Sequence, residues 1–159
     1  MSAYYKVDID RFKQHSDKNY RQQFLGLAHL AEMSYRFDDM CLFMREVVYA
    51  AKDGNDLTHD ERNLLSVAYK NAVGSRRAAW RAFHVEDATT DSPVAGLRQK
   101  VEAELQDLCL SILKLLEDHL LQHPSCTQDS MVFYRKMAGD YYRYLAEFVN
   151  NDELIQYQN

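Results

Sequence analysis

The sequence predicts an all-α protein built as an antiparallel helical array. Only five Gly and two Pro occur among 159 residues, so long stretches contain no local helix breaker. Apolar residues recur at spacings of three and four along most of the chain, and no segment is a candidate strand. The hydrophobic content of 47% is enough to bury one core, and a second independent domain is not expected.

The N-terminal part of the chain contains two predicted helices. Residues 1–17 show no sustained period, and we expect an N-terminal tail there or one loosely docked extra turn. From about Tyr20 to Ser34 the apolar residues return every three or four positions, which indicates a first amphipathic helix. A clearer helix runs from Phe37 to Ala51 and ends at the turn-forming cluster 53–55.

The third predicted helix is the longest. Thr58 followed by Glu61 has the spacing of a capping box, in which the threonine oxygen accepts from a helix amide and the glutamate accepts from the threonine amide. No proline follows until after Val85. This segment predicts a helix of about 27 residues, or roughly 40 Å at 1.5 Å per residue.

Two further helices complete the predicted array. Residues 84–96 form the break after the third helix. A fourth helix with a buried leucine-rich side then ends before His123, and a fifth runs from about Gln128 to Asn150. The predicted organisation is therefore an N-terminal tail (1–17), one helical domain (18–150) and a C-terminal tail (151–159).

Composition excludes several classes of function. A net charge of −5 and a pI near 5.6 argue against a broad nucleic-acid-binding face. Three cysteines fit neither a disulfide framework nor the spacing of metal ligands, which indicates a reducing compartment. Charged residues interrupt the richest apolar run, 108–121, so no membrane span is predicted, and no signal-peptide core follows the N-terminus. We expect a soluble, intracellular protein.

A basic stripe lies on the predicted third helix. Lys70, Gly74, Arg77 and Arg81 recur at i, i+4, i+7 and i+11, which places them on one helix face. Gly74 costs about 1 kcal/mol relative to alanine in a helix interior, so it needs a reason, either ligand access or close helix packing. The stripe itself has two interpretations, a solvated cationic face or one side of an anion site.

Arg143 in the fifth helix is the second candidate for an anion site. It lies among aromatic and apolar neighbours, and a partly buried guanidinium needs an anionic partner. Asp140 and Glu147, at i−3 and i+4, are internal candidates for that role. The alternative is an external anion.

If the third and fifth helices face each other, Lys70, Arg77, Arg143 and the Tyr144 hydroxyl converge. Guanidinium groups bind phosphate oxygens bidentately, an ammonium adds a point charge, and a phenol donates one more hydrogen bond. A phosphoserine or phosphothreonine carries about −1.5 to −2 charges at neutral pH, and it would gain more from such a pocket than a carboxylate would.

Two long segments carry a resemblance to a known family. Residues 61–81, ERNLLSVAYKNAVGSRRAAWR, closely resemble the 14-3-3 signature segment, and Lys136, Met137 and residues 139–147, GDYYRYLAE, resemble the fifth helix of that family. The resemblance covers roughly residues 27–147. It implies the first five of the family's nine helices, with Lys70, Arg77, Arg143 and Tyr144 binding the phosphate of a client protein's phosphoserine or phosphothreonine.

The resemblance also implies a dimer, either with a second copy or with other 14-3-3 chains. Opposite charges at Arg36 and Glu104, and at Asp39 and Lys100, would form salt bridges between subunits, although they could equally be ordinary surface charges. The matching interface positions are Leu30, Ser34, Arg36, Asp39, Ala79, Phe83, Leu97, Lys100 and Glu104.

The chain ends soon after the fifth predicted helix. The resemblance implies that the missing later helices supply the apolar wall of the peptide groove, so we expect weak and poorly selective binding. We also expect an apolar face on the fifth helix to be bared, including some of Met137, Tyr141 and Phe148.

The predicted function is that of a non-enzymatic, dimeric adaptor in signalling regulation, located in the cytoplasm or also in the nucleus. No cofactor or metal site is predicted, because the chain contains no Glu-x-x-His, His-Glu-x-x-His, Cys-x-x-Cys or P-loop motif. The alternative is a truncated dimerisation module that no longer binds phosphopeptides and competes for mixed dimers.

Overall fold

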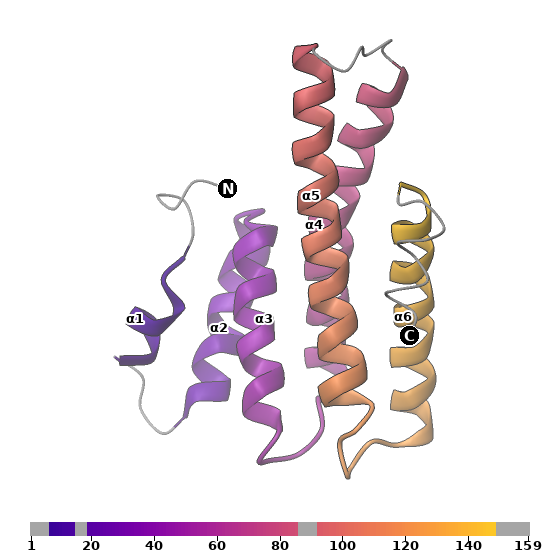
Figure 1. Ribbon diagram of the computed structural model, residues 1–159. Coiled ribbons are helices and arrows are strands. Elements are labelled where there is room, and N and C mark those ends of the chain that lie inside the picture. Colours follow the sequence, from indigo (N-terminus) through magenta and orange to yellow (C-terminus); the bar gives the residue numbers. More distant parts are fainter. Residues whose placement is uncertain (1–6, 15–18, 86–91, 149–159) are drawn as a thin grey trace.

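A computed structural model describes residues 7–14, 19–85 and 92–148, and the part of the chain that it describes is helical without strands. Figure 1 shows long helices running up and down side by side. The helices are α1 (Ile9–Gln14), α2 (Tyr20–Met33), α3 (Phe37–Ala51), α4 (His59–Val85), α5 (Pro93–Lys114), the π-helical segment η2 (Leu115–Leu120) and α6 (Gln128–Ala146). The predicted all-α array is confirmed.

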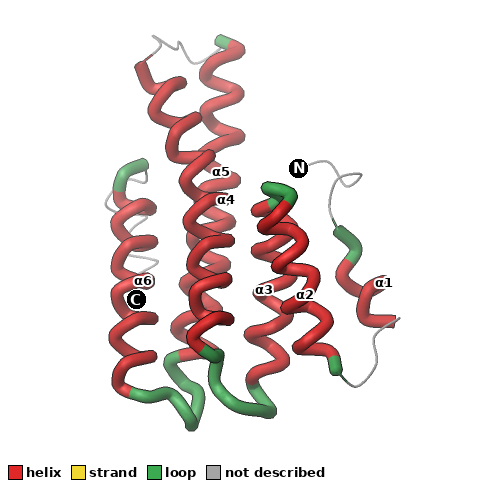
Figure 2. Tube along the Cα trace, turned by 180° about the vertical axis from the view of Figure 1, so that it is seen from behind, coloured by secondary structure: helices red, strands yellow, loops and turns green. Residues whose placement is uncertain are grey.

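The array has three layers when followed across Figure 1. The hairpin of α2 and α3 packs against the hairpin of α4 and α5, and α6 packs against α5 and η2 on the far side. The view from behind in Figure 2 shows that one end of α4 and α5 projects beyond the neighbouring helices. One continuous core fills the space between the layers, and large side chains at its centre are under 2% exposed.

The capping residues place most of the helices where the sequence predicts them. Thr58 Oγ1 accepts from the Glu61 amide (3.1 Å), and the Glu61 carboxylate accepts from the Thr58 amide (2.8 Å), so the capping box of α4 is confirmed. Thr127 Oγ1 accepts from the Ser130 amide at the start of α6.

The start of α5 corrects the predicted break. Residues 93–96 belong to the helix, because Pro93 occupies its first turn and Ser92 Oγ accepts from the Ala95 amide (3.1 Å). Residues 86–91 lie outside the described part of the chain, as do parts of the predicted N-terminal tail and all of the predicted C-terminal tail. Within 1–17, the described residues include the short helix α1, which matches the extra turn that the sequence allowed.

The expected bare face on α6 is mostly wrong. Met137 and Tyr141 are only 7% and 4% exposed, because both belong to the core, and Phe148 is half-buried against it. Val132 is the large apolar side chain that the described part of α6 leaves well exposed. The α4 and α5 helices cover the side of α6 that the sequence left without a partner.

The end of α5 differs from the prediction in its winding. Leu115–Leu120 form a π-helical turn, in which the Leu121 amide donates to the Leu116 carbonyl five residues earlier (2.8 Å). Leu115, Leu116 and Leu120 are buried there, and the segment packs against both α3 and α6.

Candidate phosphate-binding pocket

A pocket of about 420 Å³ lies between α4 and α6. Its α4 side carries part of the basic stripe, and its α6 side carries aromatic and charged residues. The residues that line it are Ser66, Lys70, Val73, Gly74, Arg77, Phe133, Lys136, Met137, Asp140, Tyr141 and Tyr144.

The charge of this pocket is positive. Among the described lining residues, Lys70, Arg77 and Lys136 are cations and Asp140 is the one carboxylate. Because the chain as a whole carries a net charge of −5, this cluster is a local exception. A local concentration of positive charge in a concave site favours an anionic ligand.

Arg77 is held in place from two directions. Its Nη2 and Nε donate to the Glu147 carboxylate at 2.8 and 3.3 Å. Its guanidinium carbon lies 3.9 Å from the centre of the Tyr144 ring, within the range of a cation–π contact. The hydrogen bond to Glu147 raises the pKa of Arg77, so this side chain is positively charged at every pH of interest.

Arg143 lies beside the pocket and does not line it. Its Nη2 donates to Asp140 Oδ1 at 3.1 Å, and its guanidinium carbon lies 5.5 Å from the Tyr144 ring centre. The structure thus brings Lys70, Arg77 and Tyr144 to one pocket and keeps Arg143 at its edge. Of the two internal partners that the sequence offered to Arg143, Asp140 pairs with it, while Glu147 pairs with Arg77.

Gly74 lines the same pocket on α4. A Cβ atom built at this position meets no atom within 4 Å, apart from the surroundings that any helical residue shares. Close helix packing is therefore not the reason for a glycine here, and the remaining explanation from the sequence is access for a ligand.

Lys136 is a lining residue that sequence reasoning did not assign to the site. It lies on α6 seven residues before Arg143 and eight before Tyr144, a spacing that brings a residue back to nearly the same helix face. That periodicity was the available signal for it.

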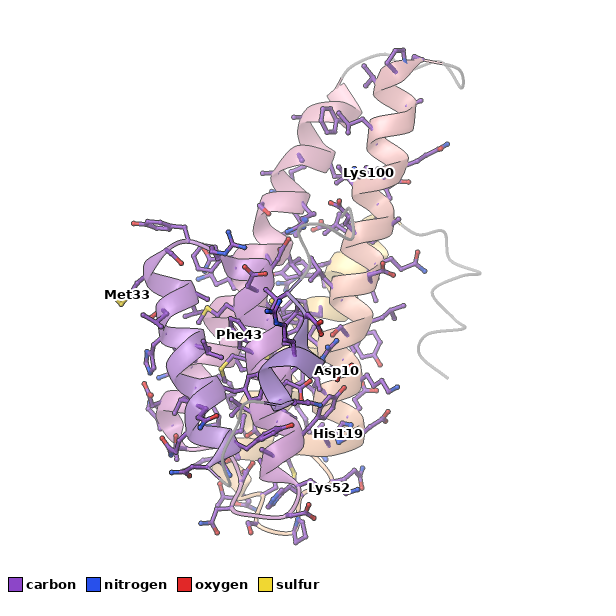
Figure 3. The ribbon with its side chains drawn as sticks, turned by 90° about the vertical axis from the view of Figure 1, so that its left-hand side faces the viewer. Asp10, Met33, Phe43, Lys52, Lys100 and His119 are labelled. Carbon is purple, nitrogen blue, oxygen red and sulfur yellow. The ribbon has the colours of Figure 1, made fainter. Side chains whose placement is uncertain are left out.

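The predicted dimer positions fall on two separate parts of the chain. Leu30 on α2 and Leu97 on α5 are 61% and 46% exposed, while Ala79 and Phe83 on α4 are half-buried against the core. Figure 3 shows Met33, the last residue of α2, at one edge of the molecule and Lys100 on the projecting part of α5. Met33 and Tyr35 are 76% and 81% exposed and enlarge the apolar surface at the end of α2 beyond the predicted positions Leu30 and Ser34.

The charged dimer positions are largely paired within the chain. Arg36 Nε lies 2.5 Å from Asp39 Oδ2, and Asp39 is only 6% exposed. Glu104 accepts from Arg76 Nε at 3.2 Å, and Arg76 also binds Asp38 through both terminal nitrogens. Sequence reasoning missed Arg76, which links α3, α4 and α5 through these two carboxylates.

Two other kinds of site were sought in the described part of the chain. No group of three or more His, Cys, Asp or Glu side chains is arranged to hold a metal ion in residues 7–14, 19–85 and 92–148. Over the same residues, no helix has the length and the apolar character needed to cross a membrane.

Comparisons with known proteins identify the family. The model of the 14-3-3 protein family matches residues 27–159. The chain is 47% identical over 141 residues to the 14-3-3-like protein F of Nicotiana tabacum, which covers 84% of this chain and 54% of that protein. It is 49% identical over 145 residues to the 14-3-3 protein 10 of Solanum lycopersicum, which covers 86% and 57%.

A third relative is the 14-3-3-like protein G-BOX factor 14 kappa of Arabidopsis thaliana, 47% identical over 142 residues that cover 84% of this chain and 56% of that protein. The chain thus spans about half the length of the curated relatives it matches. The family model, the identities and the all-helical array agree, and the chain belongs to the 14-3-3 family.

Proposed function

We propose that this chain is a phosphoserine- and phosphothreonine-dependent adaptor, which binds phosphorylated segments of client proteins in the pocket between α4 and α6 and performs no catalysis. One observation carries the proposal: Lys70 and Arg77 from α4 and Tyr144 from α6 line the same positively charged pocket. The family to which the chain belongs supports a protein-binding role.

The chemistry of the lining residues suits a phosphate monoester. The Arg77 guanidinium offers two parallel N–H donors, Lys70 adds a compact positive charge, and the Tyr144 hydroxyl can donate one hydrogen bond. A volume of about 420 Å³ is in the range of small-ligand sites and leaves room for a phosphorylated side chain and part of its neighbours.

Arg143 can complete this set after a small movement. Its side chain is 65% exposed and its pair with Asp140 spans one helix turn, so exchanging that carboxylate for a phosphate costs little. A dianion gains more from two arginines than Asp140 does, because it has more charge and more acceptor oxygens.

We also propose that two copies associate through the exposed end of α2 and the projecting part of α5. In a two-fold dimer, a surface patch on one subunit contacts a different patch on its partner, and the reverse contact follows by symmetry. The exposed Leu30 and Met33 on α2, and Leu97 on α5, form two such separate patches. Apolar contacts would then supply the affinity, since Arg36 and Glu104 already have partners in their own chain.

Fluorescence anisotropy with a labelled phosphoserine peptide and its unphosphorylated twin tests the pocket. We expect binding that needs the phosphate, weakens with added salt and is lost in Arg77→Ala. Arg135→Ala is the matched control, because Arg135 is exposed on α6 and does not line the pocket. Equal binding of the two peptides, or equal losses in the two variants, would refute the proposal.

A second candidate function is a dimerisation module that does not bind phosphopeptides. The observation that favours it is the internal pairing of both arginines, Arg77 with Glu147 and Arg143 with Asp140. If neither peptide binds while the chain still forms dimers in sedimentation analysis, this module is the better description.

A further inference from the structure

The Arg77 guanidinium already holds an anion in the ligand-free chain. Glu147, which ends α6, approaches it side-on, so that two N–H groups of one residue bind the two oxygens of the other at 2.8 and 3.3 Å. This is the geometry in which a guanidinium also binds two oxygens of a phosphate. The Glu147 carboxylate therefore occupies a position that the proposed ligand requires.

Resting on the function proposed above, we infer that Glu147 is an intrachain competitor of the phosphorylated ligand: its carboxylate must leave Arg77 before Arg77 can bind phosphate through the same edge. The pair sets a threshold on affinity. It lowers the occupancy of the pocket by any anion that needs this edge of Arg77.

The competition favours phosphate monoesters over weaker anions in absolute occupancy. A ligand carboxylate would exchange one carboxylate for another at Arg77 and would lose its own translational freedom, so little net affinity remains. A phosphate has a charge of about −1.5 to −2 and three acceptor oxygens, and it can contact Lys70 and Tyr144 while it displaces Glu147. Only the second ligand gains contacts that Glu147 does not already make.

Arg81 makes the release of Glu147 less costly. Its Nη2 lies 3.8 Å from the same Glu147 oxygen that Arg77 binds, and its side chain is 60% exposed. Glu147 is also partly exposed, at 32% of its side chain, so it can turn toward Arg81 and water without burying a charge. After displacement the carboxylate thus retains a cationic partner.

The test is to measure phosphopeptide affinity by anisotropy in the wild type, Glu147→Gln and Glu147→Asp. Partly exposed ion pairs are weak, so freeing Arg77 should tighten binding by about two- to five-fold in Glu147→Gln. Glu147→Asp keeps the charge and withdraws the carboxylate by one methylene, so it breaks the two-point contact, and we expect an intermediate gain. A gain in Glu147→Gln with none in Glu147→Asp would show that charge alone acts, and would overturn the inference.

Two further variants distinguish competition from a general field effect. In an Arg77→Ala background, Glu147→Gln should change nothing, because the contact is already absent. Arg81→Ala should weaken peptide binding in the wild type more than in Glu147→Gln, since Arg81 acts in part by holding the displaced carboxylate. Equal effects of Arg81→Ala in both backgrounds would contradict that role.

The outcomes separate this inference from the proposed function. If the wild type binds the phosphopeptide through Arg77 and Glu147→Gln binds no more tightly, the inference fails while the function stands. If neither protein binds phosphopeptide, both fail. Circular dichroism spectra that match the wild type are required of each variant, and Glu147 follows the last turn of α6, where its side chain makes no core contact.

Discussion

Arg21→Ala should be among the most destabilising single substitutions in this chain. Arg21 on α2 donates to Glu61 on α4 through Nε (2.8 Å) and Nη2 (2.7 Å), and it also binds the carbonyls of Asn55 and Asp56 in the connecting loop. Glu61 is only 2% exposed. Removing Arg21 leaves a buried carboxylate without its cation, which costs about 3–5 kcal/mol in fully buried pairs.

We expect the lower end of that range, about 3 kcal/mol, because the Arg21 side chain keeps 21% exposure. For a chain of this size the loss corresponds to a fall in Tm of roughly 6–12 °C, measurable by thermal or urea denaturation. Arg21→Ala combined with Glu61→Gln should be more stable than Arg21→Ala alone, since the buried charge is gone and the amide oxygen can still accept from Thr58. A single variant within about 1 kcal/mol of the wild type, or a double variant less stable than the single, would refute this reasoning.

The same pair predicts a pH dependence. Burial alone would raise the pKa of Glu61, but the hydrogen bonds from Arg21 and from the Thr58 amide outweigh it and lower this pKa below its ordinary value of 4.5. A carboxyl whose pKa is lowered by folding stabilises the protein above its unfolded pKa and loses that contribution as the pH falls through its folded pKa. The difference between wild type and Arg21→Ala should therefore be full at neutral pH and shrink in acid, where Glu61 is protonated.

Three other predictions concern the cap, the thiols and the dimer. Thr58→Ala removes one half of the capping box of α4 and should cost about 1 kcal/mol in urea denaturation, while Thr58→Ser should restore most of it. A thiol reagent at pH 8 should label Cys126 first in the folded protein, because burial raises the pKa of Cys109 to about 12 and raises that of Cys41 as well; fast labelling of all three would contradict the buried positions. Leu97→Glu should shift sedimentation toward the monomer without lowering Tm in proportion, since this side chain is 46% exposed in the single chain; an unchanged dimer would argue against the proposed interface.

Sequence reasoning predicted the helices that have strong local signals. The bounds of α4 follow from Thr58 and Glu61, whose side chains act over three residues. The start of α5 was predicted too late, because a proline was taken as part of the break although Ser92 makes it the first turn of a helix. Spacing alone could not show this, since proline is found both in turns and at helix starts.

For the pocket, the sequence predicted the residue types better than their pairing. Lys70, Arg77 and Tyr144 meet as expected, because a common helix face and the packing of α6 bring them together. The partners of the arginines could not be predicted in the same way. Glu147 was a candidate for Arg143 at i+4 on one helix, yet it binds Arg77 on another, 70 residues away in the chain. Contacts between helices depend on their rotation about their own axes, which periodicity leaves open.

The π-helical turn at Leu115–Leu120 has a consequence for insertions and deletions. Such a turn holds one residue more than an α-helical turn of similar length, so removing one residue would restore regular winding but rotate all that follows by about 100°. Glu117, which accepts from Tyr142 (2.6 Å), and His123, which contacts the Ala51 carbonyl (2.8 Å), fasten this end of the bundle to α6 and α3. A one-residue deletion here should thus misalign α6, while the short connection 124–126 should accept a change of length more readily.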